Sequence, residues 1–184
     1  MGDFSKKIIF ITILILLLGG ISFYFAQRSK KNSFKIKGNM KIESPVFSNN
    51  QSIPPKYTCD GENINPPLKI SNVPEEAKSL VLIVDDPDAP MGTWVHWTVW
   101  NISPQTKEIP EGAKLEGAVE GVTDFGSSGY GGPCPPSGKH RYFFKLYAID
   151  RNLDLDSSAK KKDIEAAMEG HILEQAQLIG LYER

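Results

Sequence analysis

The feature that most constrains the fold is a run of five apolar residues, Leu80–Val84, that leads directly into acidic residues. A short, uninterrupted apolar run is typical of a strand buried in the core of a sheet. The run ends at Asp85, Asp86 and Asp88, which are interleaved with prolines. The sequence therefore predicts a central strand, and it raises the question of why carboxylates stand where that strand ends.

Four further segments have the composition of strands. Residues 94–102 and 141–149 are rich in β-branched and aromatic side chains, which favour a pleated backbone. Shorter strands are expected within 40–47 and 68–74. Between the two aromatic segments lies a Gly- and Pro-rich stretch, 111–139. It is too long for a tight turn, and loops of this length inside a compact domain are usually functional.

The remaining segments complete the predicted fold class. Residues 49–68 are rich in proline and polar residues, which predicts a long ordered loop or a pair of short edge strands. Residues 157–170 have helix-forming residues and a terminal glycine, and residues 171–184 continue with apolar residues at helical spacing. We therefore expect a mainly β or α+β domain, with C-terminal helices packed at one edge of an antiparallel sheet.

The first part of the chain has a different character. Residues 8–26 contain no charge, and at about 1.5 Å per residue a helix of this length can cross a hydrocarbon layer of about 30 Å. We predict a single transmembrane helix over this span, a basic juxtamembrane tether up to residue 37, and a globular domain over 38–184. A cleaved signal peptide is the alternative, and we favour an uncleaved signal-anchor because the apolar run continues into an aromatic belt.

Charge bears on location and on partners. Residues 1–37 carry seven basic residues and one acidic residue, whereas residues 38–184 carry 14 basic and 21 acidic residues. The acidic domain argues against nucleic acid as a partner. Counting basic residues on either side of the span favours a domain facing the cytoplasm, but a short basic leader before an apolar run is typical of export. We favour a cell-membrane protein with an extracytoplasmic domain; secretion after cleavage and a cytoplasm-facing domain remain open.

Cys59 and Cys134 are the two cysteines, 75 positions apart, and no spacing suggests zinc. An exported domain could join them in a disulfide. The other interpretation, which we favour from the sequence, is a pair of small buried thiols.

Two histidines lie in the aromatic strands. Because side chains alternate along a strand, His140 and Tyr142 project on one side, next to the Gly- and Pro-rich loop. By the same rule His96 shares a face with Trp94 and Trp100. A histidine in such a strand is often only a core residue, but two of them, each beside a Pro- and Gly-rich loop and near an aspartate cluster, fit a functional site equally well.

The stretches DPDAPMGTWVHWTVWNI and YGGPCPPSGKHRYFFKLYAID resemble the two signature regions of the phosphatidylethanolamine-binding protein family, also called Raf kinase inhibitor-like proteins. The similarity is greatest to the short prokaryotic branch, and YTCDGENINPPL and AMEGHIL resemble that branch too. The resemblance covers nearly all of residues 40–184. It implies two antiparallel sheets with C-terminal helices, and a small pocket for phosphate or a similar anion.

Carried over residue by residue, the resemblance implies a pocket with polar groups, proline walls and a closing tyrosine from the C-terminal helix. These are Asp86, His96, His140 and Tyr142, then Pro90, Pro135 and Pro136, and finally Tyr182.

The acidic residues receive different roles. A carboxylate can accept a hydrogen bond from an imidazole and fix its tautomer, so that the other ring nitrogen can donate to an anion. We assign Asp86 to that role, Asp88 to the turn, and Asp85 to the exposed surface. Alternation places Arg141 opposite the histidine, which favours an ion pair with an aspartate such as Asp88.

These residues favour a binding module for an anionic small molecule or lipid head group. A protein partner or a homodimer is also compatible with the sequence. A phosphoester hydrolase using the histidines and Asp86 is the first alternative, and a kinase or protease inhibitor acting through surface loops is the second. No side chain offers a convincing nucleophile, because Ser127, Ser128 and Ser137 lie in the flexible Gly- and Pro-rich loop, where serine is expected anyway. The histidines also lack the helical spacing of common zinc hydrolases. We therefore expect no enzymatic activity, no catalytic residues, no metal and no cofactor.

Overall fold

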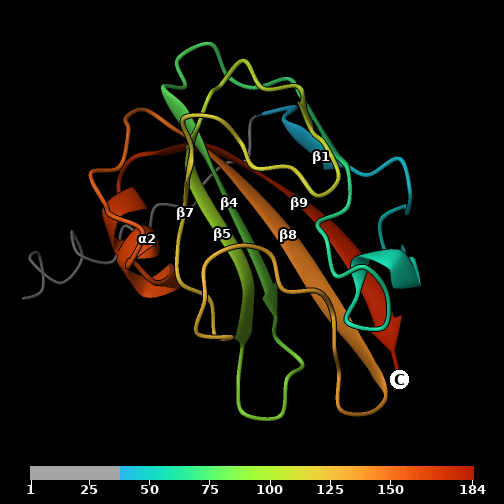
Figure 1. Ribbon diagram of the computed structural model, residues 1–184. Coiled ribbons are helices and arrows are strands. Elements are labelled where there is room, and N and C mark those ends of the chain that lie inside the picture. Colours follow the sequence, from blue (N-terminus) through green and yellow to red (C-terminus); the bar gives the residue numbers. More distant parts are fainter. Residues whose placement is uncertain (1–37) are drawn as a thin grey trace, which may run out of the picture. The chain divides into compact units, whose positions relative to one another are not determined.

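Two β-sheets pack against one hydrophobic core in the computed structural model, which describes residues 38–184 (Figure 1). The smaller sheet has three strands, in the order β1 (Lys41–Glu43), β3 (Leu68–Ser71) and β6 (Glu108–Ile109). The larger has six, in the order β2 (Gln51–Ser52), β9 (Ile172–Glu183), β8 (Lys139–Ile149), β4 (Ser79–Asp86), β5 (Trp94–Ile102) and β7 (Val119–Glu120). A short 3-10 turn, η1 (Pro55–Tyr57), and one α-helix, α2 (Lys161–Met168), complete the elements.

The prediction of a central strand is confirmed. Strand β4 lies between β5 and β8 in the larger sheet, pairs antiparallel with both, and is buried at every residue. Its side chains alternate between two cores: Leu82 and Val84 face the smaller sheet, whereas Val81 and Ile83 face the layer that contains α2. Burial on both faces explains why the strand carries an uninterrupted apolar run.

The prediction of a helix over 171–184 is wrong, because most of this segment forms strand β9. It pairs antiparallel with β8 along its whole length, from Ile172 opposite Ile149 to Glu183 opposite Lys139. Burial alternates, with Ala176, Leu178 and Gly180 buried between more exposed neighbours. The spacing of the apolar residues fits both the period of a helix and the period of a strand. Long-range pairing with β8 overrides the local helical pattern. Helix α2, which precedes β9, agrees with the prediction and ends before Gly170.

The predicted antiparallel arrangement holds with one exception. All the paired strands of both sheets run antiparallel except β2 and β9, which are parallel. Strand β2 belongs to the segment 49–68, predicted as a loop or a pair of short edge strands, and it forms one edge of the larger sheet. The fold is therefore mainly β with a single short helix among the described residues.

The predicted membrane span over 8–26 and the tether up to residue 37 lie outside the described residues. Within residues 38–184, no helix combines the length and the apolar character needed to cross a membrane.

The preference for two buried thiols is wrong, because Cys59 and Cys134 form a disulfide and both residues are exposed. The fold brings the loop that contains Cys59 against the segment that contains Cys134. The Cys59 N–H donates to the carbonyl of Pro133, at 3.1 Å. A separation of 75 positions in the sequence gave no sign of this contact.

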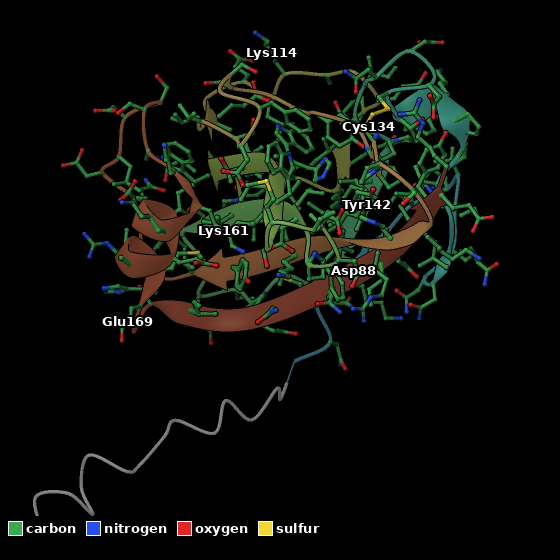
Figure 2. All side chains as sticks on the ribbon, turned by 90° about the horizontal axis from the view of Figure 1, so that it is seen from below. Asp88, Lys114, Cys134, Tyr142, Lys161 and Glu169 are labelled. Atoms are coloured by element: carbon green, nitrogen blue, oxygen red, sulfur yellow. A yellow bond between two sulfur atoms is a disulfide. The ribbon has the colours of Figure 1, made fainter. Side chains whose placement is uncertain are left out.

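The expected exposure of Asp85 is also wrong. This carboxylate is fully buried, and it accepts from Lys145 Nζ at 2.8 Å and from Lys161 Nζ at 2.6 Å. Lys161 belongs to α2, so the ion pair ties the helix to the sheet. In Figure 2 Lys161 lies beside the helix, well separated from Tyr142. Consecutive residues point to opposite faces, so Asp85 anchors the helix while Asp86 faces the other side of the sheet.

Candidate functional site

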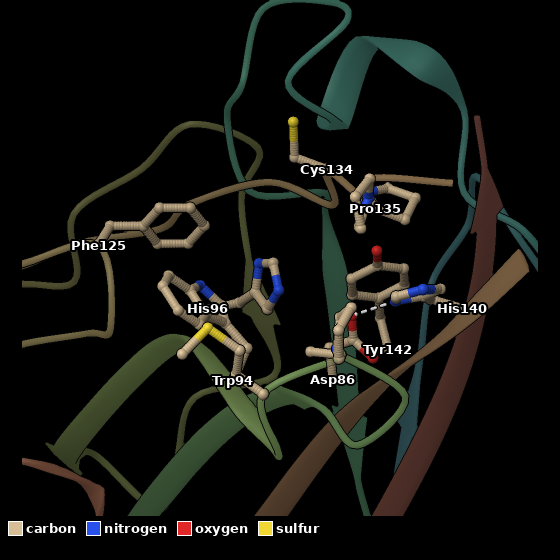
Figure 3. A pocket seen from close by; sticks show the side chains of 12 residues that line it. Asp86, Trp94, His96, Phe125, Cys134, Pro135, His140 and Tyr142 are labelled. Atoms are coloured by element: carbon tan, nitrogen blue, oxygen red, sulfur yellow. Dashed lines mark hydrogen bonds and ion pairs between the residues drawn. The ribbon is translucent and has the colours of Figure 1, made fainter. Parts of the chain in front are cut away.

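A cavity of about 430 Å³ opens where β4 ends and β5 and β8 begin (Figure 3). The turn after β4 and the Gly- and Pro-rich loop supply the rest of its lining. The residues that line it are Asp86, Ala89, Pro90, Met91, Trp94, His96, Phe125, Cys134, Pro135, Pro136, His140 and Tyr142. Seven of the eight pocket residues predicted from the sequence are therefore in one cavity.

His140 and Asp86 form the polar centre of the cavity. Nδ1 of His140 lies 2.7 Å from Oδ2 of Asp86, and the two side chains are 9% and 4% exposed. The other oxygen of Asp86 accepts the N–H of Asp88 at 2.8 Å. Because a carboxylate accepts, Nδ1 of His140 carries a proton, and the ring is held with its other nitrogen free for a ligand.

His96 reaches the cavity through a β-bulge. In the pairing of β4 with β5, Val84 lies opposite Trp97 and Asp85 opposite Val95, so His96 is an extra residue. A bulge re-aims side chains, and here it separates His96 from Trp100, which is buried on the α2 side. Simple alternation, which placed His96 and Trp100 on one face, is wrong at this point.

The protonation of His96 follows from its partners. Nδ1 lies 2.7 Å from the carbonyl oxygen of Gly131, so this nitrogen carries the proton in the neutral ring. Burial lowers the pKa of His96 below its ordinary value, although the hydrogen bond to Gly131 and the charge of Asp86 act in the opposite direction. Near pH 7 the ring is therefore neutral, and its Nε2 is an acceptor.

Tyr142 brings a donor without a partner. The side chain is 1% exposed, and its hydroxyl makes no hydrogen bond to any residue that the structure describes. Burial, followed by the nearby charge of Asp86, raises the pKa of Tyr142, so the hydroxyl stays protonated. A buried polar group without a hydrogen bond costs free energy, which a ligand accepting from it would recover. Figure 3 shows this hydroxyl pointing towards Pro135.

Phe125 and Met91, on the aromatic side of the cavity, were missed from the sequence. Phe125 contacts Trp94 and His96 edge-to-face, with ring centroids 5.5 and 5.3 Å apart. Met91, at the mouth, is 95% exposed. A large apolar residue within a Gly-rich loop is the one signal that could have singled out Phe125. Of the three tryptophans only Trp94 lines the cavity; Trp97 and Trp100 are buried in the two cores.

Tyr182 does not line the cavity, so its predicted role as the closing tyrosine is wrong. It lies on β9 opposite His140, not on a helix, and its hydroxyl donates to Oδ2 of Asp60 at 2.7 Å. The pairing of β9 with β8 directs this side chain to the loop that follows η1.

The predicted pairing of Arg141 with an aspartate is confirmed. Its guanidinium donates to both oxygens of Asp88, at 2.6 and 2.8 Å, and its backbone N–H donates to the same carboxylate at 3.0 Å. The hydrogen bonds from Arg141 lower the pKa of Asp88 to about 2. This ion pair braces the turn after β4 against β8, outside the lining of the cavity.

The cavity offers directional polar groups but no cluster of metal ligands. Across residues 38–184, no group of three or more His, Cys, Asp or Glu side chains is placed to hold a metal ion. Asp86, His96, His140 and Tyr142 can instead donate and accept hydrogen bonds around one small ligand, with apolar walls that strengthen each bond.

The likeness to known proteins extends over nearly all of the described residues. A model of the phosphatidylethanolamine-binding protein family matches residues 43–183. A UPF0098 protein of Methanothermobacter thermautotrophicus is 53% identical over 150 residues, which is 79% of this chain and 99% of the relative. A UPF0098 protein of Pyrococcus horikoshii is 54% identical over 157 residues, which is 80% of this chain and 78% of the relative.

Solved structures show the same family likeness. The phosphatidylethanolamine-binding protein homologue CT736 from Chlamydia trachomatis has a TM-score of 0.77 at 47% identity, covering 79% of this chain and 97% of that one. E. coli YbcL, described as a member of the mammalian family of these proteins, has a TM-score of 0.75 at 32% identity, covering 79% of this chain and 98% of that one. On the family match and these identities, the chain belongs to the phosphatidylethanolamine-binding protein family.

Proposed function

We propose that the domain binds phosphate-type anions or phospholipid head groups in this cavity and does not chemically transform them. One observation carries the proposal: a buried tyrosine hydroxyl without a partner lies in the same cavity as a histidine held by a carboxylate. A ligand oxygen placed between Tyr142 and His140 would satisfy both groups.

The cavity suits a ligand that carries both acceptors and donors. In its imidazolium form His140 can donate to Asp86 with one nitrogen and to an anion with the other. His96, neutral near pH 7, accepts instead. A singly protonated phosphate, or a head group with an ammonium beside its phosphate, offers both kinds of group. The aromatic side, Trp94 and Phe125, would cover the methylene groups or face the ammonium.

The lining supports binding rather than turnover. Among the residues that line the cavity there is no serine, threonine or lysine, and its one cysteine is oxidised in the disulfide. The histidines therefore have no serine, threonine, lysine or free cysteine in the cavity to activate as a nucleophile. Ser127, Ser128 and Ser137, the loop serines, are all outside the lining.

We also propose that residues 8–26 anchor the domain to the cell membrane with the domain on the extracytoplasmic side. The support is the length of the uncharged apolar run and the basic leader before it. Protease treatment of intact cells tests the orientation, since only an extracytoplasmic domain is cleaved.

Replacing His140 with alanine should weaken the binding of phosphoethanolamine by roughly 100-fold. The variant loses a donor and leaves the buried carboxylate of Asp86 without its partner, next to the anion. Isothermal titration calorimetry measures the affinity. The matched control is His171→Ala, because His171 also pairs through Nδ1 with an aspartate, Asp150, but lies outside the cavity.

Tyr142→Phe serves as a second variant because it removes only the unpartnered hydroxyl. It should keep the native circular dichroism spectrum and bind about tenfold more weakly, the usual loss for one hydrogen bond. If both His140→Ala and Tyr142→Phe bind like the unsubstituted protein while folded, the ligand lies elsewhere.

A further inference from the structure

The disulfide forms part of the wall of the proposed binding cavity. Cys134 lines that cavity and also a second one of about 210 Å³, which Cys59 lines as well. Figure 3 shows Cys134 next to Pro135, above the hydroxyl of Tyr142. Both cysteines are exposed. A small thiol can therefore reach the bond from solvent, which a buried structural disulfide does not allow.

The disulfide is linked to His96 through residues 130–136, which we call the wall segment. On its outer side the wall segment rests on η1 and the loop that follows it: the Tyr130 hydroxyl donates to the carbonyl of Tyr57 at 2.9 Å, and the Gly132 N–H donates to Asn63 Oδ1 at 2.7 Å. On its inner side the carbonyl of Gly131 accepts from His96. The position of the wall segment therefore sets the tautomer and direction of the His96 ring.

The wall segment is also closely packed. A side chain at Gly132 would come within 2.8 Å of the backbone of Thr58 and Tyr57, and one at Gly131 would overlap the ring of Phe125. Pro135 and Pro136 then line the cavity beyond the disulfide. A small outward movement of the wall segment would change the contacts of several cavity residues at once.

A positive charge lies beside the sulfur atoms. The guanidinium nitrogen Nη1 of Arg184 is 3.4 Å from Sγ of Cys134 and 3.9 Å from Sγ of Cys59, and Nη2 is 3.2 Å from Oδ1 of Asp60. The carbonyl of Arg184 accepts the N–H of Gly138, which fixes the residue against the end of the loop. A neighbouring cation stabilises a thiolate and makes that sulfur a better leaving group.

We propose that the Cys59–Cys134 disulfide is a reversible redox switch that controls the affinity of the anion cavity; this proposal rests on the proposed function. The reaction partner is a dithiol. One of its thiolates attacks Sγ of Cys59, the S–S bond breaks, and its electron pair leaves on Cys134 as a thiolate beside Arg184. The second thiol of the reductant then attacks the reductant's own sulfur in the mixed disulfide, forming a new S–S bond within the reductant; the bond to Cys59 breaks, and the Cys59 sulfur leaves with the electron pair and takes up the proton of the attacking thiol. Two electrons pass from the dithiol to the protein, and an oxidant of the disulfide class reverses the exchange.

The reduced state keeps the fold but loosens the wall segment. The covalent link that holds Cys134 in place is gone, so the hydrogen bonds of the segment to Tyr57, Cys59 and Asn63 open more often than in the oxidised protein. The segment then occupies positions in which Gly131 no longer holds His96. Affinity falls in proportion to the fraction of molecules in the competent state.

The first experiment compares the oxidised and the dithiothreitol-reduced protein for phosphoethanolamine binding by calorimetry. Reduction should weaken binding by about tenfold, and reoxidation should restore it. Near-ultraviolet circular dichroism shows whether the reduced protein is folded. Equal affinity in the two states overturns the switch, and so does loss of the native spectrum, because the bond would then serve only to hold the fold. Absence of binding in the oxidised protein instead contradicts the proposed function.

The second experiment follows the rate of reduction by dithiothreitol and needs no ligand. Arg184→Gln should slow reduction by about threefold, whereas Arg184→Lys should retain most of the rate. The matched control is Arg151→Gln, whose side chain contacts Asn152 and His171 rather than the sulfurs. If Arg184→Gln and Arg151→Gln are reduced at the same rate as the unsubstituted protein, the guanidinium has no part in the exchange and the proposal fails.

Discussion

Replacing Cys59 and Cys134 together with serine is expected to lower the free energy of unfolding by about 4 kcal/mol. The bond joins positions 75 residues apart, so it removes much conformational freedom from the unfolded chain. For a domain of this size the melting temperature should fall by about 10 °C. Urea denaturation under oxidising conditions measures the free energy directly.

Reduction of the unsubstituted protein provides the control, because it breaks the same bond without changing a residue. Reduction and the double substitution should lower the free energy of unfolding by the same amount. A change below about 1 kcal/mol in both would mean that the hydrogen bonds of the wall segment already restrict the chain, and that the disulfide contributes little to the fold.

Asp85→Asn is expected to cost about 3 kcal/mol of stability, because it breaks a buried ion pair from one side only. The carboxylate is fully buried and neutralises Lys145 and Lys161, whose side chains are 24% and 20% exposed. The asparagine fills the same volume but leaves Lys145 without this counter-charge and Lys161 with only Glu165, at 3.7 Å. Helix α2 should loosen first, which amide hydrogen exchange over residues 161–168 detects.

Asp88→Asn is the matched control for this prediction. Asp88 also pairs with a basic residue, Arg141, but that pair is largely open to solvent, with side chains 27% and 53% exposed. Exposed pairs contribute about 1 kcal/mol or less. Similar costs for Asp85→Asn and Asp88→Asn would contradict the distinction between a buried anchor and a surface brace.

The central strand shows what the sequence can predict. Its apolar run demands burial on both faces, and the structure supplies a core on each side. Alternation along β8 placed His140 and Tyr142 on one side and Arg141 on the other, as observed. These features depend on residues close together in the chain and on one strong periodicity.

The errors came from contacts between distant parts of the chain. Ile172–Glu183 has a pattern that fits helix or strand, and only its pairing with β8 decides between them. The bulge at His96 depends on the register between β4 and β5. Phe125 reaches the cavity because its loop folds back over β5, and its apolar side chain in a Gly-rich loop is only a weak local signal of this contact. The resemblance of the motifs to the family located the polar residues, whereas Phe125 could be placed in the cavity only from the structure.

The adjacent carboxylates at the end of β4 now have separate explanations. Asp85 holds the helix on one face of the sheet, Asp86 orients His140 on the other, and Asp88 braces the turn through Arg141. The acidic end of β4 thus anchors helix α2 on one face of the sheet and supplies the polar centre of the cavity on the other. This arrangement explains why the apolar run Leu80–Val84 is followed directly by aspartates.

The most direct test of the account is a nuclear magnetic resonance titration of the three histidines in metal-free, oxidised protein with phosphoethanolamine. The chain has only His96, His140 and His171, so each ring signal can be assigned from single substitutions. We predict that the signals of His96 and His140 shift along one saturable curve while the signal of His171 stays unchanged. Unmoved signals from His96 and His140, or shifts that require added zinc, would contradict it.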